Sequence, residues 1–202
     1  MFFAVPPLSM DVPPPNRLEI PQAPTDPRAF AGSSRKVSNV PGVTVSYYDA
    51  VGITIPQLHD WLAKHGPRDA QTHQVNPATS NWSIGTAVRF SRTGGKCTLT
   101  GADVKFSGTG QLPRLMPDKR RPASVVANWN AYVAALEDRQ AAQLIFVQQR
   151  VHEVQIAIMN SSCGNWQKAA AAAISRLSED QAKAFRPDSE MQPKLLEPES
   201  GS

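Results

Sequence analysis

Three polar residues interrupt the apolar face of a long predicted helix. Between Ser124 and Gly164 the chain has no proline or glycine, and apolar residues recur every three or four positions. Near the middle stand Arg139, Gln140 and Gln143. At least one of them must face the sheet or its rim, where an unsatisfied buried polar group costs about 1–3 kcal/mol. Active-site helices carry such interruptions, and so do helices whose middle turn meets solvent.

The histidines offer a second kind of chemistry. His152 and Glu153 are adjacent, but Ile156 stands four residues after His152, so the pair does not form a zinc motif. The other histidines fall on the first predicted helix and the loop after it: His59, His65 and His73. An enzyme with an unrecognised metal site, its ligands drawn from the histidines or from Asp49 and Glu153, is therefore one alternative.

The two cysteines, Cys97 and Cys163, lie in different predicted elements. Their number and separation suit one disulfide in an oxidising compartment, and two buried free thiols are the alternative. They are too far apart in sequence to form a close metal-binding pair.

The charge pattern narrows the class of partner. The net charge is +4, from 21 basic and 17 acidic residues, and the densest basic run is Lys119-Arg120-Arg121. Nucleic-acid binders carry a longer basic stripe with interleaved aromatics, so we expect no nucleic-acid partner. No stretch reaches the roughly 20 apolar residues of a transmembrane helix. The apolar start, Met1 to Met10, is broken by prolines and is at most the remnant of a signal peptide.

The proline distribution predicts three regions. Residues 1–41 hold half of the eighteen prolines and are expected to be a proline-rich extended linker. Residues 42–186 form the folded domain, and residues 187–202 form a polar C-terminal tail.

The folded region divides into strands followed by helices. A strand begins near Val43, and a short helix capped by Thr54 ends at Gly66. Residues 82–90 alternate as a strand, and Gly94-Gly95 turns the chain into one or two further strands over 97–106.

Residues 107–122 are expected to be a long connection, because they contain prolines and glycines. The long helix follows, and then a second helix from Cys163 to at least Leu177, capped by Ser161-Ser162. The predicted class is α+β, a small antiparallel sheet of three to four strands packed on the long helix and the C-terminal helix.

Several short motifs resemble, in order and spacing, the bacterial family of predicted secreted zinc-dependent proteases. Residues 47–54 (YYDAVGIT) resemble the family's opening "YYxVxGxT", and residues 58–67 resemble its "L…L…GP" helix. Trp82 lies in a segment that resembles its tryptophan-bearing strand, although two tryptophans are common there. Leu112-Pro113 resembles its "LP", and residues 129–136 resemble its "W..Y...L". Cys97 and Cys163 stand where the family places a cysteine pair.

The resemblance also implies what this chain lacks. The family continues with H-E-x-x-H, in which two histidines bind zinc and the glutamate polarises water. Here Arg139 and Gln143 stand at the ligand positions and Gln140 at the general base, while Met191 replaces a downstream histidine. Arginine and glutamine neither bind zinc well nor accept a proton, so no catalytic residue, metal or cofactor is expected.

The resemblance therefore implies a pseudo-peptidase, a non-catalytic binding or scaffold protein of the bacterial envelope, periplasmic or secreted. A protein or peptide partner would occupy a cleft near Arg139, Gln143, Trp129 and Trp82. We hypothesise that the Arg139 guanidinium replaces the metal, held by Gln143 or a nearby carboxylate. The alternative is a structural envelope component that self-associates.

Overall fold

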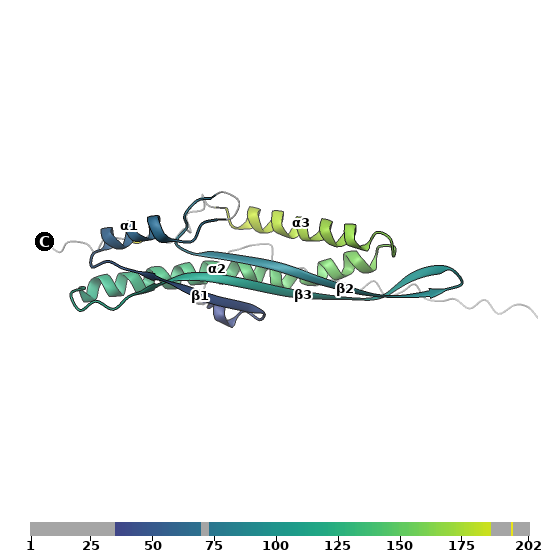
Figure 1. Ribbon diagram of the computed structural model, residues 1–202, viewed down its shortest axis with the longest axis horizontal. Helices are drawn as coiled ribbons and strands as arrows, with labels where there is room; N and C mark the ends of the chain where they lie inside the picture. Colours follow the sequence, from purple (N-terminus) through teal and green to yellow (C-terminus); the bar gives the residue numbers. More distant parts are fainter. Residues whose placement is uncertain (1–34, 70–72, 187–194, 196–202) are drawn as a thin grey trace, which may run out of the picture.

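The computed structural model describes residues 35–69, 73–186 and 195. Its elements follow in the order η2 (Val37–Asn39), β1 (Val43–Ala50), α1 (Ile55–His65), β2 (Thr79–Thr93), β3 (Lys96–Leu115), α2 (Ala123–Met159) and α3 (Trp166–Ala184). The molecule is elongated, and the β2–β3 hairpin extends beyond the turn that joins α2 to α3 (Figure 1). The α+β class with a long helix and a C-terminal helix is confirmed.

The sheet has three strands in the order β1-β3-β2, so β3 is central. β2 and β3 form the predicted antiparallel hairpin, with positive φ angles at both residues of the Gly94-Gly95 turn. β1 pairs with β3 in parallel, so the expectation of a purely antiparallel sheet is wrong. The chain passes through α1 and β2 between these two strands, and such a long crossover permits parallel pairing.

β3 runs unbroken to Leu115, so the connection expected over residues 107–122 is limited to the residues after Leu115. Its glycines allow close packing instead of ending the strand. A Cβ on Gly110 would lie 2.7 Å from Val37 Cγ1, and one on Gly108 would lie 2.9 Å from Val43 Cγ2. These two positions therefore exclude larger residues because other side chains occupy the space.

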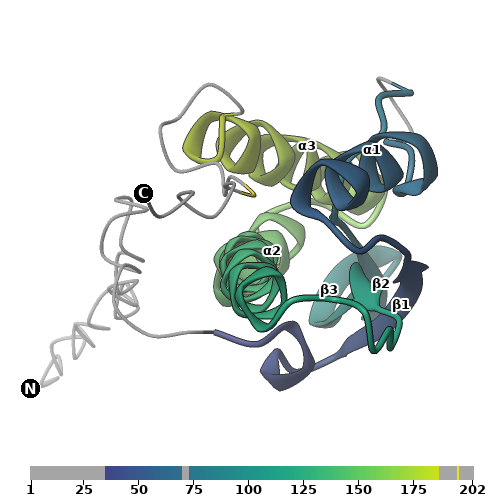
Figure 2. The same ribbon diagram turned by 90° about the vertical axis from the view of Figure 1, so that its left-hand side faces the viewer.

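α2 covers one face of the sheet along its length, while α1 and α3 lie on the same side of the layer formed by α2 and the sheet (Figure 2). Thr54 caps α1 in a capping box with Gln57, as its sequence predicts. Asn165 precedes α3, and its side chain makes no capping bond, so the expected Ser161-Ser162 cap is wrong.

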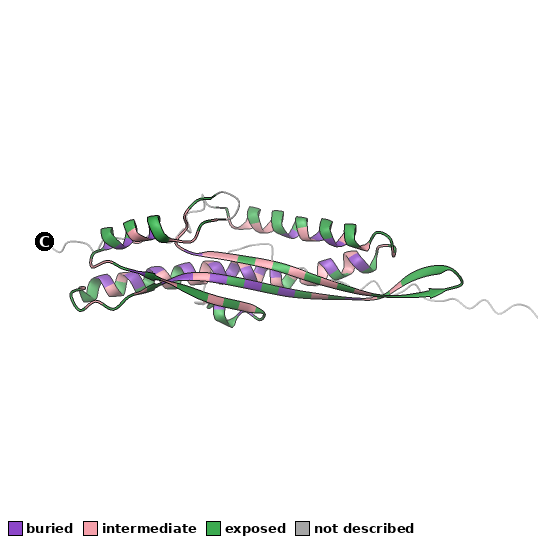
Figure 3. Cartoon of the chain, viewed as in Figure 1, coloured by how far each residue is buried: buried purple, intermediate pink, exposed green. Residues whose placement is uncertain are grey.

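Buried side chains form two clusters. The larger one lies under α1, β1 and the first two thirds of α2, and includes Leu58, Trp129 and Leu144. The smaller one lies between the outer hairpin, the end of α2 and α3, and half of its buried members are alanines. Burial thus thins toward the tip of the hairpin (Figure 3).

A disulfide joins Cys97 on β3 to Cys163 in the α2–α3 turn, confirming the disulfide prediction. It fastens the outer hairpin to the helices, beside the smaller cluster. None of the helices in the described ranges combines the length and apolar character that crossing a membrane requires.

The folded part begins before the predicted boundary at residue 42. Val37 is fully buried, and the Arg35 guanidinium donates two hydrogen bonds to the Asp138 carboxylate, at 3.0 and 3.1 Å. The last residues of the predicted linker therefore belong to the fold. In the predicted tail, Leu195 packs against the larger cluster.

Candidate functional site

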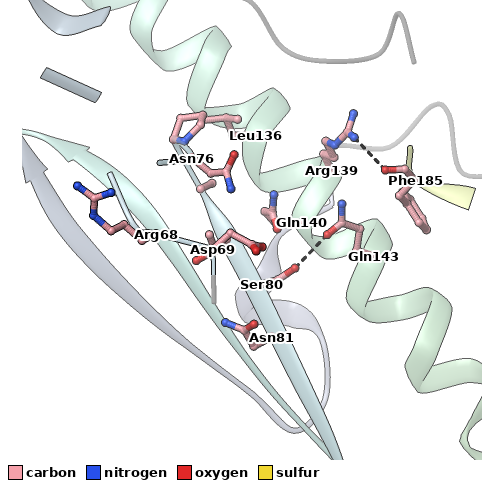
Figure 4. A pocket seen from close by; sticks show the side chains of 13 residues that line it. Arg68, Asp69, Asn76, Ser80, Asn81, Leu136, Arg139, Gln140, Gln143 and Phe185 are labelled. Atoms are coloured by element: carbon pink, nitrogen blue, oxygen red, sulfur yellow. Dashed lines mark hydrogen bonds between the residues drawn. The ribbon is translucent and has the colours of Figure 1, made fainter. Parts of the chain in front are cut away.

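A cavity of about 310 Å³ lies against the middle turn of α2, between that helix, the start of β2 and the loop before β2 (Figure 4). The three polar residues that interrupt the helix stripe all line it: Arg139, Gln140 and Gln143. Its polar lining from the other side is Arg68, Asp69, Asn76, Thr79, Ser80 and Asn81. The polar gap in the helix therefore faces a polar cavity.

Gln143 ties the helix to the sheet. Ser80 Oγ donates to Gln143 Oε1 at 3.1 Å, and Gln181 Nε2 donates to the Gln143 carbonyl oxygen at 3.0 Å. Trp82 Nε1 in turn donates to Gln181 Oε1 at 2.8 Å. This chain of bonds joins β2, α2 and α3 and fixes one wall of the cavity.

Gln140 differs from its neighbour Gln143. Only 7% of its surface is exposed, and it is the one buried polar residue in the described part of the chain. Its side-chain amide has no hydrogen-bond partner among the described residues, and it points into the cavity (Figure 4). The amide atoms themselves are not enclosed, since His152 Nε2 is the one enclosed side-chain polar atom without a partner in the described residues. The Gln140 amide is therefore open to a ligand in the cavity.

Arg139 points toward the end of α3. Its Nη2 donates to the carbonyl oxygens of Phe185 and Arg186, at 3.3 and 3.4 Å. Burial lowers the pKa of Arg139, yet a guanidinium remains protonated in proteins. Among the described residues no bond joins it to Gln143, whose Oε1 accepts from Ser80, so the expectation that Gln143 holds the guanidinium is wrong. A nearby carboxylate as its anchor stays a prediction.

The two tryptophans expected at the cleft have separate places. Trp129 is 2% exposed and belongs to the larger cluster, so its assignment to a partner cleft is wrong. Trp82 does line a cavity, but a neighbouring one. Met191 lies outside the described residues.

That neighbouring cavity, of about 710 Å³, is a groove between β2 and α3. It shares Asp69, Ser80, Asn81, Gln143 and Phe185 with the first cavity, so the two form one continuous depression. The remaining lining residues come from two elements, β2 (Trp82, Ser83 and Ile84) and α3 (Ile174, Ser175, Ser178, Gln181 and Ala182). β2 is an edge strand of the sheet, so the groove runs beside an edge.

A comparison with protein families matches residues 45–186 to the family described as "Bacterial protein of unknown function (DUF922)". The chain belongs to this family. The match covers the whole of the depression, all of β2 and β3, and β1 from its third residue. No curated protein and no solved structure gives a significant match.

The α2 wall of the cavity in this DUF922 domain does not fit a zinc ion. The cavity wall on α2 presents a guanidinium and two amides, and these groups cannot supply the imidazole or carboxylate ligands that zinc takes in proteins. Within the ranges described, no three His, Cys, Asp or Glu residues lie together as a metal site. The early histidines are separate from the cavity: His59 is exposed, and His65 stacks on Trp61 at a ring distance of 3.9 Å.

Half of the site in this DUF922 domain was not anticipated from the sequence. Asp69, Asn76 and Asn81 belong to a segment that is expected only to be a polar loop and a strand start. The sequence signal for this half of the site is the concentration of polar residues just before an edge strand. A short antiparallel bridge pairs Arg68 with Val75 in this segment.

Proposed function

We propose that this chain is a non-catalytic member of a peptidase-like family that binds a peptide segment of a protein partner. The observation that carries this proposal is the Gln140 amide, which faces the cavity and forms no hydrogen bond within the described part of the protein. It stands where the resemblance places a general base. An amide cannot take a proton from water, but it can both donate to and accept from a peptide bond.

The shape of the depression supports a peptide as the ligand. The groove follows β2 from Ser80 to Ile84 along an edge of the sheet. An edge strand presents unpaired backbone groups, and an extended peptide can bind there by adding a strand. Gln140 would then lie at one end of the bound segment and the face of α3 beside the rest.

The disulfide supports a location outside the cytoplasm. Disulfides persist in oxidising compartments such as the bacterial periplasm, and Cys97 is exposed, so reductants would reach this bridge. We place the protein in the periplasm or outside the cell, where its partner is an envelope protein.

The first experiment is the metal content of the purified protein, with thermal melts in zinc and in chelator. We expect no stoichiometric zinc and no shift of the melting temperature. Bound zinc that raises the melting temperature, or hydrolysis of any member of a peptide library, would contradict the non-catalytic assignment.

The second experiment is a selection of 12-residue peptides on the purified protein, followed by titration of the best peptide. The variant Gln140→Met is expected to weaken its binding about ten-fold, because one hydrogen bond to the ligand is lost. Stability should be nearly unchanged, because the Gln140 amide forms no hydrogen bond within the described residues. Gln149→Met, on an exposed position of the same helix, is the matched control and should change neither quantity. Equal peptide binding by the wild type and Gln140→Met would refute the proposed site.

A further inference from the structure

Two segments near the outer end of the molecule carry basic residues and no acidic ones. The segments 82–102 and 154–178 contain no Asp or Glu, and their basic residues are Arg89, Arg92, Lys96, Lys168 and Arg176. The rest of the described residues hold 13 basic side chains and all 10 of the described acidic ones, a formal charge of +3. In both segments the positive charge is therefore not offset by carboxylates within the same stretch.

The two segments are in contact with each other. The Cys97–Cys163 disulfide joins the hairpin to the α2–α3 turn, and the smaller cluster packs Ala102 against the helices. The carboxylates that adjoin the two segments in sequence are Asp103, Glu153 and Glu179. Asp103 pairs with Arg89, and Glu153 pairs with Arg150. In the described part of the chain, Arg92, Lys96 and Lys168 are exposed and form no ion pair.

Apolar side chains are exposed at the same end. Phe90 on the outer hairpin is 51% exposed, and Met159 at the end of α2 is 39% exposed. They are two of only five large apolar residues exposed in the described ranges. All residues from Arg89 to Thr98 are exposed, and this part of the hairpin projects past the helices (Figure 3).

We infer that this end of the molecule docks on an anionic lipid surface. Uncompensated Lys and Arg side chains are attracted to anionic headgroups over about a Debye length. An aromatic ring and a thioether beside them can enter the boundary between headgroups and acyl chains. A nucleic acid fits less well, because the cations lie around a narrow hairpin end and do not form a stripe with interleaved aromatics. The docking is reversible and leaves the groove beside α3 open to a partner.

The inference does not depend on the proposed peptide site and is tested separately. The full chain, disulfide intact, is sedimented with vesicles of pure phosphatidylcholine and with vesicles that contain phosphatidylglycerol at about one lipid in three. We expect binding to the anionic vesicles only, lost in high salt, with Arg92→Gln/Lys96→Gln lowering the partition coefficient at least about ten-fold. Phe90→Ser should lower it by a smaller factor, because the cations remain.

The matched control is Lys64→Gln/Lys119→Gln, which removes two exposed cations outside the two segments. It should bind anionic vesicles as the wild type does. An equal loss in both double variants would overturn the assignment of the surface, since net charge alone would then explain binding. No binding to anionic vesicles, or hairpin-dependent binding to duplex DNA in their place, would overturn the lipid assignment.

Discussion

The two halves of this molecule are held together differently. In the inner half, α1, β1 and most of α2 enclose the larger cluster, with fully buried Leu58, Leu144 and Val147. In the outer half, the hairpin meets α3 over a cluster in which Ala102, Ala170 and Ala173 supply half of the buried residues. A covalent bridge, Cys97–Cys163, lies only in the outer half.

The difference shows which half is held together by apolar burial and which half has a covalent bond in addition. Alanine buries little area, and stabilisation by burial scales with area at about 25 cal/mol per Å². The outer cluster therefore contributes less than the inner one, and the disulfide compensates by restricting the unfolded chain. The candidate site lies between the two halves, where a hydrogen bond from Gln181 to Gln143 joins α3 to α2.

Truncating one leucine in each half tests the comparison most directly. Leu144→Ala should lower the free energy of unfolding by about 4 kcal/mol, since Leu144 is fully enclosed and lies near Gly108. Leu177→Ala should cost only about 2–3 kcal/mol, because its surroundings are thinner and can collapse. Urea denaturation of both variants measures this order, and equal losses would show that the two clusters are equivalent.

Removal of the disulfide should affect the outer half selectively. Cys97→Ala/Cys163→Ala opens a loop with a sequence separation of 66 residues and should cost about 2–4 kcal/mol of stability. Amide hydrogen exchange should rise near Arg92 and Trp166 while the amides of the inner β3 stay protected. A uniform rise along β3 would mean that the two halves open as one unit.

The smallest effect concerns the polar contact that fastens the N-terminal turn to the inner half. Burial raises the pKa of Asp138, but the hydrogen bonds from Arg35 outweigh it and lower the pKa below its usual value. A lowered folded-state pKa contributes stability above about pH 4 that is lost as the pH falls further. Asp138→Asn should therefore cost about 0.5–1 kcal/mol at pH 7 and nothing near pH 2. A difference independent of pH, measured by thermal melts, would assign the effect to packing.

Local signals predicted the elements where local chemistry decides them. Thr54 and Pro56 placed α1 correctly, and the turn glycines placed the β2–β3 hairpin. The end of β3 was missed because Gly108, Gly110 and Pro113 were interpreted as strand breakers. The glycines fit against side chains far away in sequence. Pro113 lies past Gln111, the last β3 residue paired with β2, so β3 has a neighbour on one side only and tolerates a proline.

The candidate site was predictable only in part. The helical spacing of the apolar residues identifies Arg139, Gln140 and Gln143, because a polar gap in an apolar stripe is visible in the sequence. Which of them lacks a partner depends on Ser80, which reaches Gln143 from β2, 63 residues away in the chain. Trp129 was misassigned because a large aromatic on a helix face serves a core as readily as a cleft. Tertiary contacts decide both points.

The parallel pairing of β1 with β3 has a consequence for how the chain reaches this structure. Val43 lies opposite Gly108, so the first strand is made long before its partner. The hairpin of β2 and β3 needs only a tight turn and closes early, whereas β1 must close a large loop at a greater entropic cost. We expect β1 to dock late, on a hairpin already resting against α2. A chain crossing a membrane in an extended state would therefore fold only after its C-terminal half has followed.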